Sequence, residues 1–468
     1  MFVRHVQQPV RCERGGVPRG GARAPCGGAP MSRIVRRVAG TPIGGARLAP
    51  RRRPGFSPRR AVASILQVKR PPEDQWILLP ALFLIGLGVL MVFSSSALNS
   101  LISSDDAYSM GMRQMLFAAM GIGALAILSS VDYRRWRPYV APLFIGSIAL
   151  LIVVLLPGVP TEQGLRRSLS VGPISIHAAE LGKLALVLFL AHLFANRGHL
   201  MAERETLYPA LLAIGGTFLL VLVAPDLGTA AVVAGIGFAL FFTAGAPLRW
   251  VFGTVLMAVA ISVIGVSLRP YQAARLNNWL DPFSDPTGGS YQTLQGLIAI
   301  ATGGFFGTGI GTSQQPGGVI IPYAWNDYIF AVVGEEFGFL GAAVVIGAFV
   351  MIAVRGLRVA RRAPDTFGAL LATGIVVWIC GQAFLNIGVV LAILPVTGIP
   401  LPLLSQGGSS LFVLMCAIGL LLSVSRETMG VQEIGGTNAR GDRGRRYGGA
   451  PLSGVRRRSY APTSTARR

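Results

Sequence analysis

Residues 76–96 read WILLPALFLIGLGVLMVFSSS, a stretch without a charged side chain. A helix needs about 20 apolar residues to cross the hydrocarbon core of a bilayer, so this stretch is long enough to span it. Its apolar residues do not alternate with polar ones, as the strands of a membrane barrel would. Nine similar runs follow, and together they predict an all-α polytopic membrane protein with ten transmembrane helices, at residues 76–96, 114–130, 138–157, 177–195, 208–224, 229–245, 249–267, 327–353, 367–394 and 409–425.

The composition agrees with this fold class. Of the 468 residues, 52% are apolar and only 13% are charged, and the mean hydropathy is +0.58. An ordinary soluble protein carries about 25% charged residues, so a soluble enzyme is excluded. A disordered protein is excluded as well, because it would be poor in apolar residues. The four cysteines suggest neither a disulfide framework nor a zinc site.

The net charge of +22 comes from the two ends of the chain. Residues 1–70 hold 16 Lys and Arg against one acid, and residues 426–468 hold 10 against three. Basic tails beside a membrane domain are typical of cytoplasmic segments that face anionic lipid. Nucleic-acid binding is disfavoured, because no binding fold accompanies the charge. We predict disordered basic cytoplasmic tails at residues 1–70 and 427–468, and a membrane domain at residues 71–426.

The arginines between the spans predict the orientation. With the N-terminus inside, the inner loops carry ten arginines and the outer loops five, as the positive-inside rule requires. Both termini are then cytoplasmic, and the long loop at residues 268–326, between the seventh and eighth helices, is extracytoplasmic. Within it, residues 290–304 (SYQTLQGLIAIATGG) are too short to span and predict a re-entrant or interfacial helix.

Two charged residues, Glu180 and Lys183, lie inside the predicted fourth span. They are three residues apart, so they share a helix face and can form an ion pair. Intramembrane charges are functional candidates, and a purely structural pair is an equally good interpretation. Arg166 and Arg167 precede this span. Asp226, in the turn at residues 224–229, is expected to cap the next helix.

The long outer loop combines arginines with glycines. Arg269, Arg275 and Gln292 lie in or beside its polar part, and glycines recur at residues 303–311. Glycine lets the backbone approach a ligand closely, and a guanidinium group donates two parallel hydrogen bonds to a phosphate. The pattern predicts a pyrophosphate or sugar site, with plain turn formation as the alternative for the glycines.

Asp327 is the leading candidate for catalysis, because it stands where the outer loop enters the eighth span. A carboxylate at such an edge is placed to act as a base or to bind a divalent cation, and capping the helix is the alternative. Structural roles are favoured for Glu335 and Glu336. Ser409 and Ser410 open the tenth helix, where they either bind an anion or cap the helix.

At four places the chain resembles the SEDS family of bacterial cell-wall proteins, which includes FtsW, RodA and SpoVE. The matching motifs occur in the family's order over residues 76–425. They are APDLGT at 224–229, RLNNWLDPFSDPTGGSYQ at 275–292, DYIFAVVGEEFG at 327–338 and LPVTGIPLPLLSQGGSS at 394–410.

This resemblance implies a peptidoglycan glycosyltransferase of the bacterial cytoplasmic membrane. Such an enzyme joins lipid II, an undecaprenyl-pyrophosphate-linked disaccharide-pentapeptide, into glycan strands in cell division or elongation. The resemblance further implies that Asp327 deprotonates the acceptor sugar hydroxyl, alone or with a bound Mg²⁺ or Mn²⁺. The implied partner is a class B penicillin-binding protein, a transpeptidase, beside other divisome or elongasome proteins. The expected substrate-binding residues are Arg166, Arg167, Glu180, Lys183, Arg269, Arg275, Gln292, Ser409 and Ser410.

The chain departs from the family pattern at four positions. Trp325-Asn326 precedes Asp327, where the family commonly has His-Thr or His-Asn, and Ser168, His177 and Gln406 replace Trp, Gln and Tyr or Ala. These changes predict a divergent paralogue, slightly closer to FtsW. Two other functions stay open: a lipid II flippase or transporter, favoured by the buried charges, and a non-catalytic scaffold that recruits the transpeptidase.

Overall fold

The computed structural model describes residues 74–104, 108–157, 168–171, 174–198, 203–267, 270–311, 321 and 324–445. All of them belong to one compact unit, Lys69–Arg468. The predicted tail at residues 1–70, and the part of the other tail beyond residue 445, lie outside the described residues.

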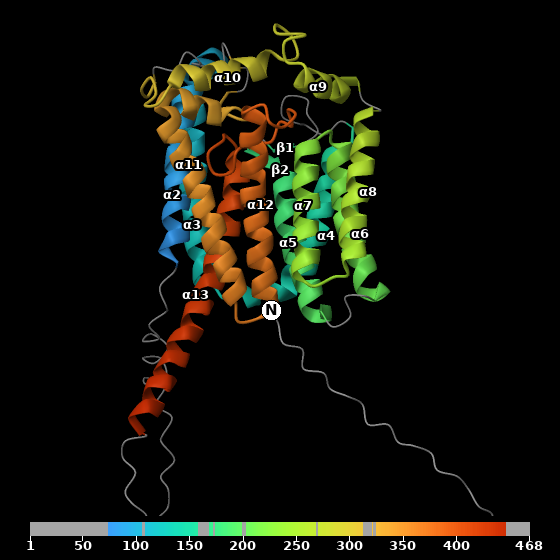
Figure 1. The fold of residues 1–468 in the computed structure, drawn as a ribbon, viewed down its shortest axis with the longest axis vertical. Helices are drawn as coiled ribbons and strands as arrows, with labels where there is room; N and C mark the ends of the chain where they lie inside the picture. Colours follow the sequence, from blue (N-terminus) through green and yellow to red (C-terminus); the bar gives the residue numbers. More distant parts are fainter. Residues whose placement is uncertain are drawn as a thin grey trace, which may run out of the picture. The chain divides into compact units, whose positions relative to one another are not determined.

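Apolar helices run side by side in a bundle, as the sequence predicts (Figure 1). In the described part of the chain, nine helices are long and apolar enough to cross a membrane, and α7 is a shorter apolar helix. The protein is therefore a multi-pass membrane protein. The bundle consists of α2 Gln75–Ser104, α3 Ser109–Ser130, the 3₁₀ helix η1 Tyr133–Tyr139 with α4 Val140–Leu155, α5 Ala178–Arg197, α6 Arg204–Val223, α7 Leu227–Thr243, α8 Leu248–Ser267, α11 Ile329–Arg362, α12 Thr366–Val390 and α13 Gly408–Arg445.

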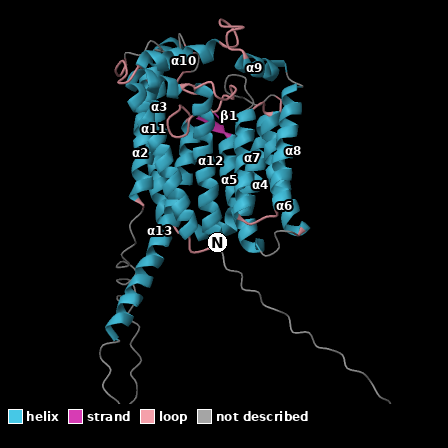
Figure 2. Ribbon diagram, viewed as in Figure 1, coloured by secondary structure: helices cyan, strands magenta, loops and turns pink. Residues whose placement is uncertain are grey.

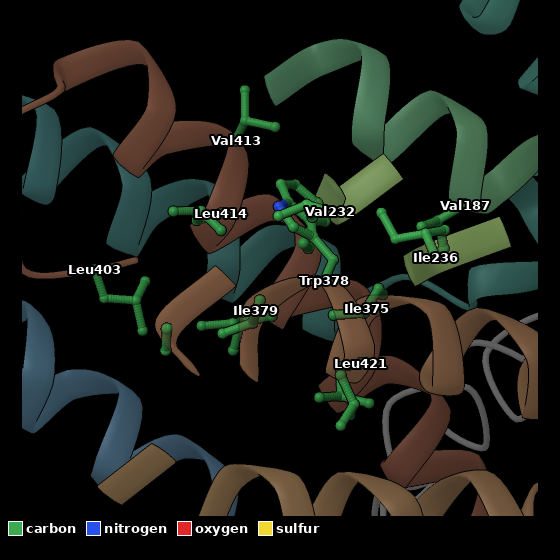
Figure 3. Packing of buried hydrophobic residues seen from close by; sticks show 14 of the residues in the cluster. Val187, Val232, Ile236, Ile375, Trp378, Ile379, Leu403, Val413, Leu414 and Leu421 are labelled. Atoms are coloured by element: carbon green, nitrogen blue, oxygen red, sulfur yellow. The ribbon is translucent and has the colours of Figure 1, made fainter. Parts of the chain in front are cut away.

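The core of the bundle lies around α12 and α13, whose apolar residues are buried on most sides. Trp378 of α12 is fully buried there among aliphatic side chains of neighbouring helices (Figure 3). Close approach of α12 to α5 requires Gly374, because a Cβ atom there would lie 2.6 Å from Val187 Cγ1. Small residues of this kind let membrane helices pack tightly without a hydrophobic driving force between them.

Helix α8 is packed differently from the others. Among its side chains only Val251 is buried, and Phe252, Leu256 and Met257 are largely exposed. An apolar helix with an exposed surface is stable only where lipid covers it, so most of α8 faces the bilayer.

One end of the bundle carries additional short elements, which we call the α9/α10 end (Figure 1). Helix α10, Tyr291–Gly303, is the predicted short helix at residues 290–304. Helix α9, Pro270–Leu280, was not predicted, because its residues are polar on average and only Leu276, Trp279 and Leu280 repeat at helical spacing. The strands β1, Ser168–Val171, and β2, Ile174–His177, form an antiparallel hairpin that was predicted as loop (Figure 2).

The glycines at residues 303–311 pack against a break in α11. Gly338 has φ 65° and interrupts the helix. The freed carbonyls of Glu335 and Glu336 accept hydrogen bonds from the amides of Thr308 and Gly309, at 2.9 and 3.0 Å. A Cβ atom on Gly303 would lie 2.0 Å from the Gly334 carbonyl oxygen. Close packing against the α11 backbone therefore accounts for these glycines, a role that the sequence analysis did not predict.

Helix α13 extends beyond residue 426, where the sequence predicts that the tail begins. An existing helix adds one hydrogen bond for each residue it fixes, so it continues readily into a polar segment. The predicted disordered segment is thus helical as far as Arg445.

Candidate active site

Asp327 lies two residues before α11 begins, at the α9/α10 end of the bundle. The residue in the N-cap position is Tyr328, so Asp327 does not cap the helix. Its side chain is half-buried. The main-chain carbonyl of Asp327 accepts a hydrogen bond of 2.8 Å from Asn386 Nδ2 in α12, and the same nitrogen donates to the Ile399 carbonyl at 2.8 Å. One buried amide thus joins the Asp327 segment to the loop between α12 and α13.

That loop also holds the two residues before Asp327. The Gln406 amide donates to the Trp325 carbonyl at 3.0 Å, and Ser405 Oγ donates to the Asn326 carbonyl at 2.6 Å. Both bonds end on main-chain carbonyls, and the first is entirely main chain. The departures from the family pattern at Trp325 and Gln406 therefore leave this bond intact.

A cavity of about 160 Å³ lies beside this segment, and we call it the central cavity. Its walls come from elements far apart in the sequence. The first turns of α5, α7 and α13 all reach it, and the positive ends of three helix dipoles therefore converge there. Its polar lining includes Arg113, Gln114, Ser175, His177, Glu180, Asp226, Thr229, Asn326, Gln406 and Ser410.

Glu180 and Lys183 form the ion pair that their spacing predicts. Lys183 Nζ lies 2.8 Å from Glu180 Oε1 and donates a second bond, of 2.6 Å, to Gln382 Oε1. Lys183 is fully buried, sits 5.3 Å from the centre of the Trp378 ring and does not line the central cavity. Glu180 does line it, and no described residue bonds to its buried Oε2 atom. The pair thus presents one acceptor to the cavity.

Asp226 caps α7, as predicted. Its Oδ1 atom accepts from the Thr229 amide at 3.0 Å, and Oδ2 accepts from the Thr229 hydroxyl at 2.9 Å. The structure also places Asp226 on the wall of the central cavity.

The two serines at the start of α13 have different surroundings. Ser409 Oγ accepts a hydrogen bond of 3.0 Å from the His177 amide and so fixes the end of the β hairpin. Ser410 lines the central cavity, and its hydroxyl donates to the Gly407 carbonyl at 2.9 Å. Ser410 is thus the serine positioned to meet a ligand.

Arg113 is a cavity residue that sequence reasoning missed. It lies in α3 at the cavity, where its Nη2 atom donates to Ser175 Oγ at 3.4 Å. Its neighbour Gln114 is buried and bridges the Ser405 carbonyl and the Gly407 amide, each at 3.3 Å. The available signal was a polar Arg-Gln pair at the start of an apolar run.

Arg275 lies apart from the central cavity. It lines two other cavities, of about 310 and 240 Å³, and donates to the Val396 carbonyl at 3.4 Å. Gln292 and Thr293 line the larger one. Thr293 Oγ1 lies 3.3 Å from the hydroxyl of Tyr328. Arg166, Arg167 and Arg269 lie outside the described residues.

Tyr328 is fully buried between these sites. Burial raises the pKa of Tyr328 to about 12, and the neighbouring Asp327 carboxylate contributes to the rise. The hydroxyl therefore stays protonated at neutral pH and acts only as a hydrogen-bonding group.

The described residues include no group of three or more His, Cys, Asp or Glu side chains that could hold a metal ion. A resident metal site made by the protein alone does not fit them. Mg²⁺ often binds through one or two carboxylates together with substrate phosphates, and Asp327 offers one such carboxylate.

Comparison with known proteins identifies the chain's relatives. The model of the FtsW/RodA/SpoVE cell cycle protein family matches residues 75–430. Stage V sporulation protein E of Bacillus subtilis is 37% identical over 77% of this chain and 99% of its own length. The probable peptidoglycan glycosyltransferase FtsW of Geobacter sp. strain M18 is 35% identical over 76% of this chain and 98% of its own.

Two solved structures share the fold, and each covers 76% of this chain. A chain of a peptidoglycan synthase complex superposes with a TM-score of 0.63 at 28% identity, and this match covers 98% of that chain. The rod shape determining protein RodA of Thermus thermophilus gives a TM-score of 0.56 at 25% identity over 97% of its chain. These matches show that the chain belongs to the FtsW/RodA/SpoVE family, the SEDS proteins.

Proposed function

We propose that this chain is a SEDS peptidoglycan glycosyltransferase that polymerises lipid II on the outer face of the bacterial cytoplasmic membrane. One observation carries the proposal: hydrogen bonds to its main-chain carbonyls fix the segment with Asp327 at the wall of a cavity where Arg113 and three helix N-termini converge. Fixed positive charge beside a positioned base suits a reaction that releases a pyrophosphate.

The proposed step is a displacement at the anomeric carbon of the donor sugar. The acceptor hydroxyl oxygen forms a bond to that carbon, and its proton passes to the Asp327 carboxylate. The bond between the anomeric carbon and the pyrophosphate oxygen breaks, and the electron pair leaves with the undecaprenyl pyrophosphate. Arg113 and the first turn of α13 are placed to stabilise the charge on this leaving group.

Participation of a divalent cation in the reaction is a separate proposal. Since the described residues do not form a protein-held metal site, Asp327 would hold such an ion together with the substrate, and the ion would stabilise negative charge on the phosphates. Assays with and without Mg²⁺ or Mn²⁺ test this directly.

The proposed partner is a class B penicillin-binding protein. The support is that a similar chain occurs in a peptidoglycan synthase complex that coordinates polymerization and crosslinking. The proposed role is in cell division or in elongation, and localising the protein at the septum or along the side wall distinguishes the two. Cytoplasmic termini are proposed from the distribution of arginine and are tested by reporter fusions at each end.

The deciding experiment is glycan synthesis from purified lipid II, with the partner transpeptidase present. Asp327→Asn keeps the size of the side chain and removes the base, so polymer should fall to background. Asp281→Asn, in the exposed turn after α9, is the matched control and should polymerise normally. Equal polymer from wild type and Asp327→Asn would exclude Asp327 as the base. No polymer from an intact wild-type complex would favour the transport or scaffold alternatives.

A further inference from the structure

The smaller of the two cavities lined by Arg275 has no role in the reaction proposed above. We call it the lateral cavity; its volume is about 240 Å³. Its lining includes Ser262 and Val266 of α8, Gln272 and Arg275 of α9, and Val396 and Thr397 of the loop after α12. Most of its lining side chains are apolar, and the polar ones lie on α8, on α9 and on the loop after α12.

The lateral and central cavities lie on opposite sides of a shared wall. In the turn before α7, Pro225 and Leu227 line the lateral cavity, whereas Asp226 between them lines the central one. In the loop after α12, Val396 and Thr397 line the lateral cavity, and Gly398 the central one. Two chain segments thus separate two sites, each of which contains one arginine among its described lining residues.

Two buried oxygen atoms of the lateral cavity have no hydrogen-bond partner among the described residues. No described residue hydrogen-bonds to Gln272 Oε1 or to Thr397 Oγ1, although both atoms are buried. Gln272 is only 5% exposed, so its side chain is removed from bulk water. An unsatisfied buried polar atom is costly, which points to a ligand that supplies the bond.

The chemistry of these groups defines that ligand. Arg275 and the Thr397 hydroxyl can donate to a phosphate. Gln272 Oε1 cannot bond to a phosphate oxygen, because both atoms are acceptors, and it requires a hydroxyl or an amide N–H group. A ligand that carries a phosphate next to a sugar hydroxyl or N-acetyl group satisfies all three.

The position of the lateral cavity indicates that the ligand also carries a lipid chain. Ser262 and Val266 belong to α8, whose neighbouring side chains Val263 and Ile264 are exposed along the membrane-facing helix. A prenyl chain attached to the phosphate can therefore follow α8 into the bilayer without crossing the polar end of the bundle.

We propose that the lateral cavity binds the pyrophosphate and first sugar of the acceptor, while the central cavity binds the donor. This assignment rests on the proposed function, since polymerisation needs two lipid-linked reactants at once. The donor and acceptor sites differ in how much negative charge they must stabilise. The donor's pyrophosphate gains charge as it leaves, and the three helix N-termini and Arg113 serve that need. The acceptor's pyrophosphate does not change charge, so a single arginine in an apolar cavity suffices to anchor it.

Photo-cross-linking to the full-length protein tests the assignment with two probes, each with a diazirine on the prenyl chain. One is farnesyl pyrophosphate, and the other is the same molecule with N-acetylmuramic acid on its pyrophosphate. Labelled peptides from α8 and α9 report the lateral cavity, and those from α3 the central one. Inorganic pyrophosphate and farnesol, added as competitors, separate recognition of the phosphate from that of the lipid.

The two key variants should differ in their response. Gln272→Leu should reduce α8 labelling by the sugar-bearing probe about tenfold and leave that by farnesyl pyrophosphate unchanged. Arg275→Gln should reduce α8 labelling by both probes. Asn277→Leu, on the exposed face of α9, is the control and should alter neither. Unchanged α3 labelling shows that each variant is folded.

Three results would overturn the proposal: no α8 or α9 labelling in wild type, equal loss of both probes in Gln272→Leu, or no loss in Arg275→Gln. These outcomes are independent of the polymerase assay. Wild-type polymer without lateral labelling rejects the acceptor site alone, whereas lateral labelling without polymer rejects the proposed function and, with it, the acceptor role.

Discussion

Asn386 holds Asp327 by its main chain: a buried side-chain nitrogen in α12 donates to the Asp327 carbonyl oxygen at 2.8 Å. This bond fixes the backbone that carries the carboxylate. Asn386 does not line the central cavity, so we describe it as a positioning residue.

Replacing Asn386 tests this role. Asn386→Leu leaves the carbonyls of Asp327 and Ile399 without their donor, and each unsatisfied buried group costs about 1–3 kcal/mol. We expect a lower unfolding temperature and at least a tenfold lower kcat, with KM for lipid II nearly unchanged. Asn386→Gln, which keeps the donor, should recover part of kcat. A purely structural role would instead lower the active fraction in both variants and leave the kcat of the folded enzyme intact.

The buried ion pair predicts a non-additive effect on stability. Lys183→Met leaves the Glu180 carboxylate buried without its cation and should cost about 3–5 kcal/mol. The double variant Glu180→Gln, Lys183→Met removes both charges and should be markedly more stable than Lys183→Met. Thermal unfolding in detergent measures the coupling. Additive losses would mean that the pair contributes nothing beyond its two members.

The break in α11 predicts a contrast between two glycines of one helix. Gly338→Ala should be destabilising, because the site has positive φ and its Cβ would lie 2.4 Å from the Gly307 amide nitrogen. Gly347→Ala, where a Cβ meets no atom within 4 Å, should be neutral or stabilising by up to about 1 kcal/mol. Unfolding temperatures of the two variants, measured side by side, check this. Equal effects would show that the break at Gly338 is not required.

Arg113 should matter for the departing pyrophosphate. Arg113→Gln removes a cation that lines the central cavity, and we expect kcat for polymerisation to fall on the order of 10²-fold. Arg113→Lys keeps the charge and loses the two-pronged geometry, so it should recover only part of the rate. A glycan assay at saturating lipid II distinguishes the variants. Full activity of Arg113→Gln would exclude the residue from the donor site.

Tyr328 predicts a loss of stability at high pH. Its pKa in the folded protein is about 12, above the usual value of 10.0, so folding favours the neutral phenol. This contribution is complete below pH 10 and is lost as the pH rises towards 12. The difference in unfolding temperature between wild type and Tyr328→Phe should therefore shrink over that range. A constant difference would show that the phenol is not buried as described.

The sequence was sufficient for the spans, the capping aspartate and the ion pair, because length, apolar content and spacing are local properties. Helix α9 and the β hairpin could not be predicted from the sequence, since their stability comes from packing on the end of the bundle. The cavities could not be predicted from the sequence for a similar reason, because their walls join residues far apart in the chain. The central cavity, for example, joins Arg113, Asp226 and Gly407. The glycines at 303–311 pack against the break in α11, and the sequence could not predict this role because the break itself depends on tertiary contacts.

The hydrogen bond between the Gln406 amide and the Trp325 carbonyl has an evolutionary consequence. Main-chain groups are the same in every residue except proline, so selection can change the side chains at both positions without disturbing the geometry of the active site. Side-chain variation at these two positions is thus free to adapt the enzyme to a different cell wall, while the spacing of the loop is under the stricter constraint. A one-residue insertion there should be far more harmful than any substitution except proline at residue 406.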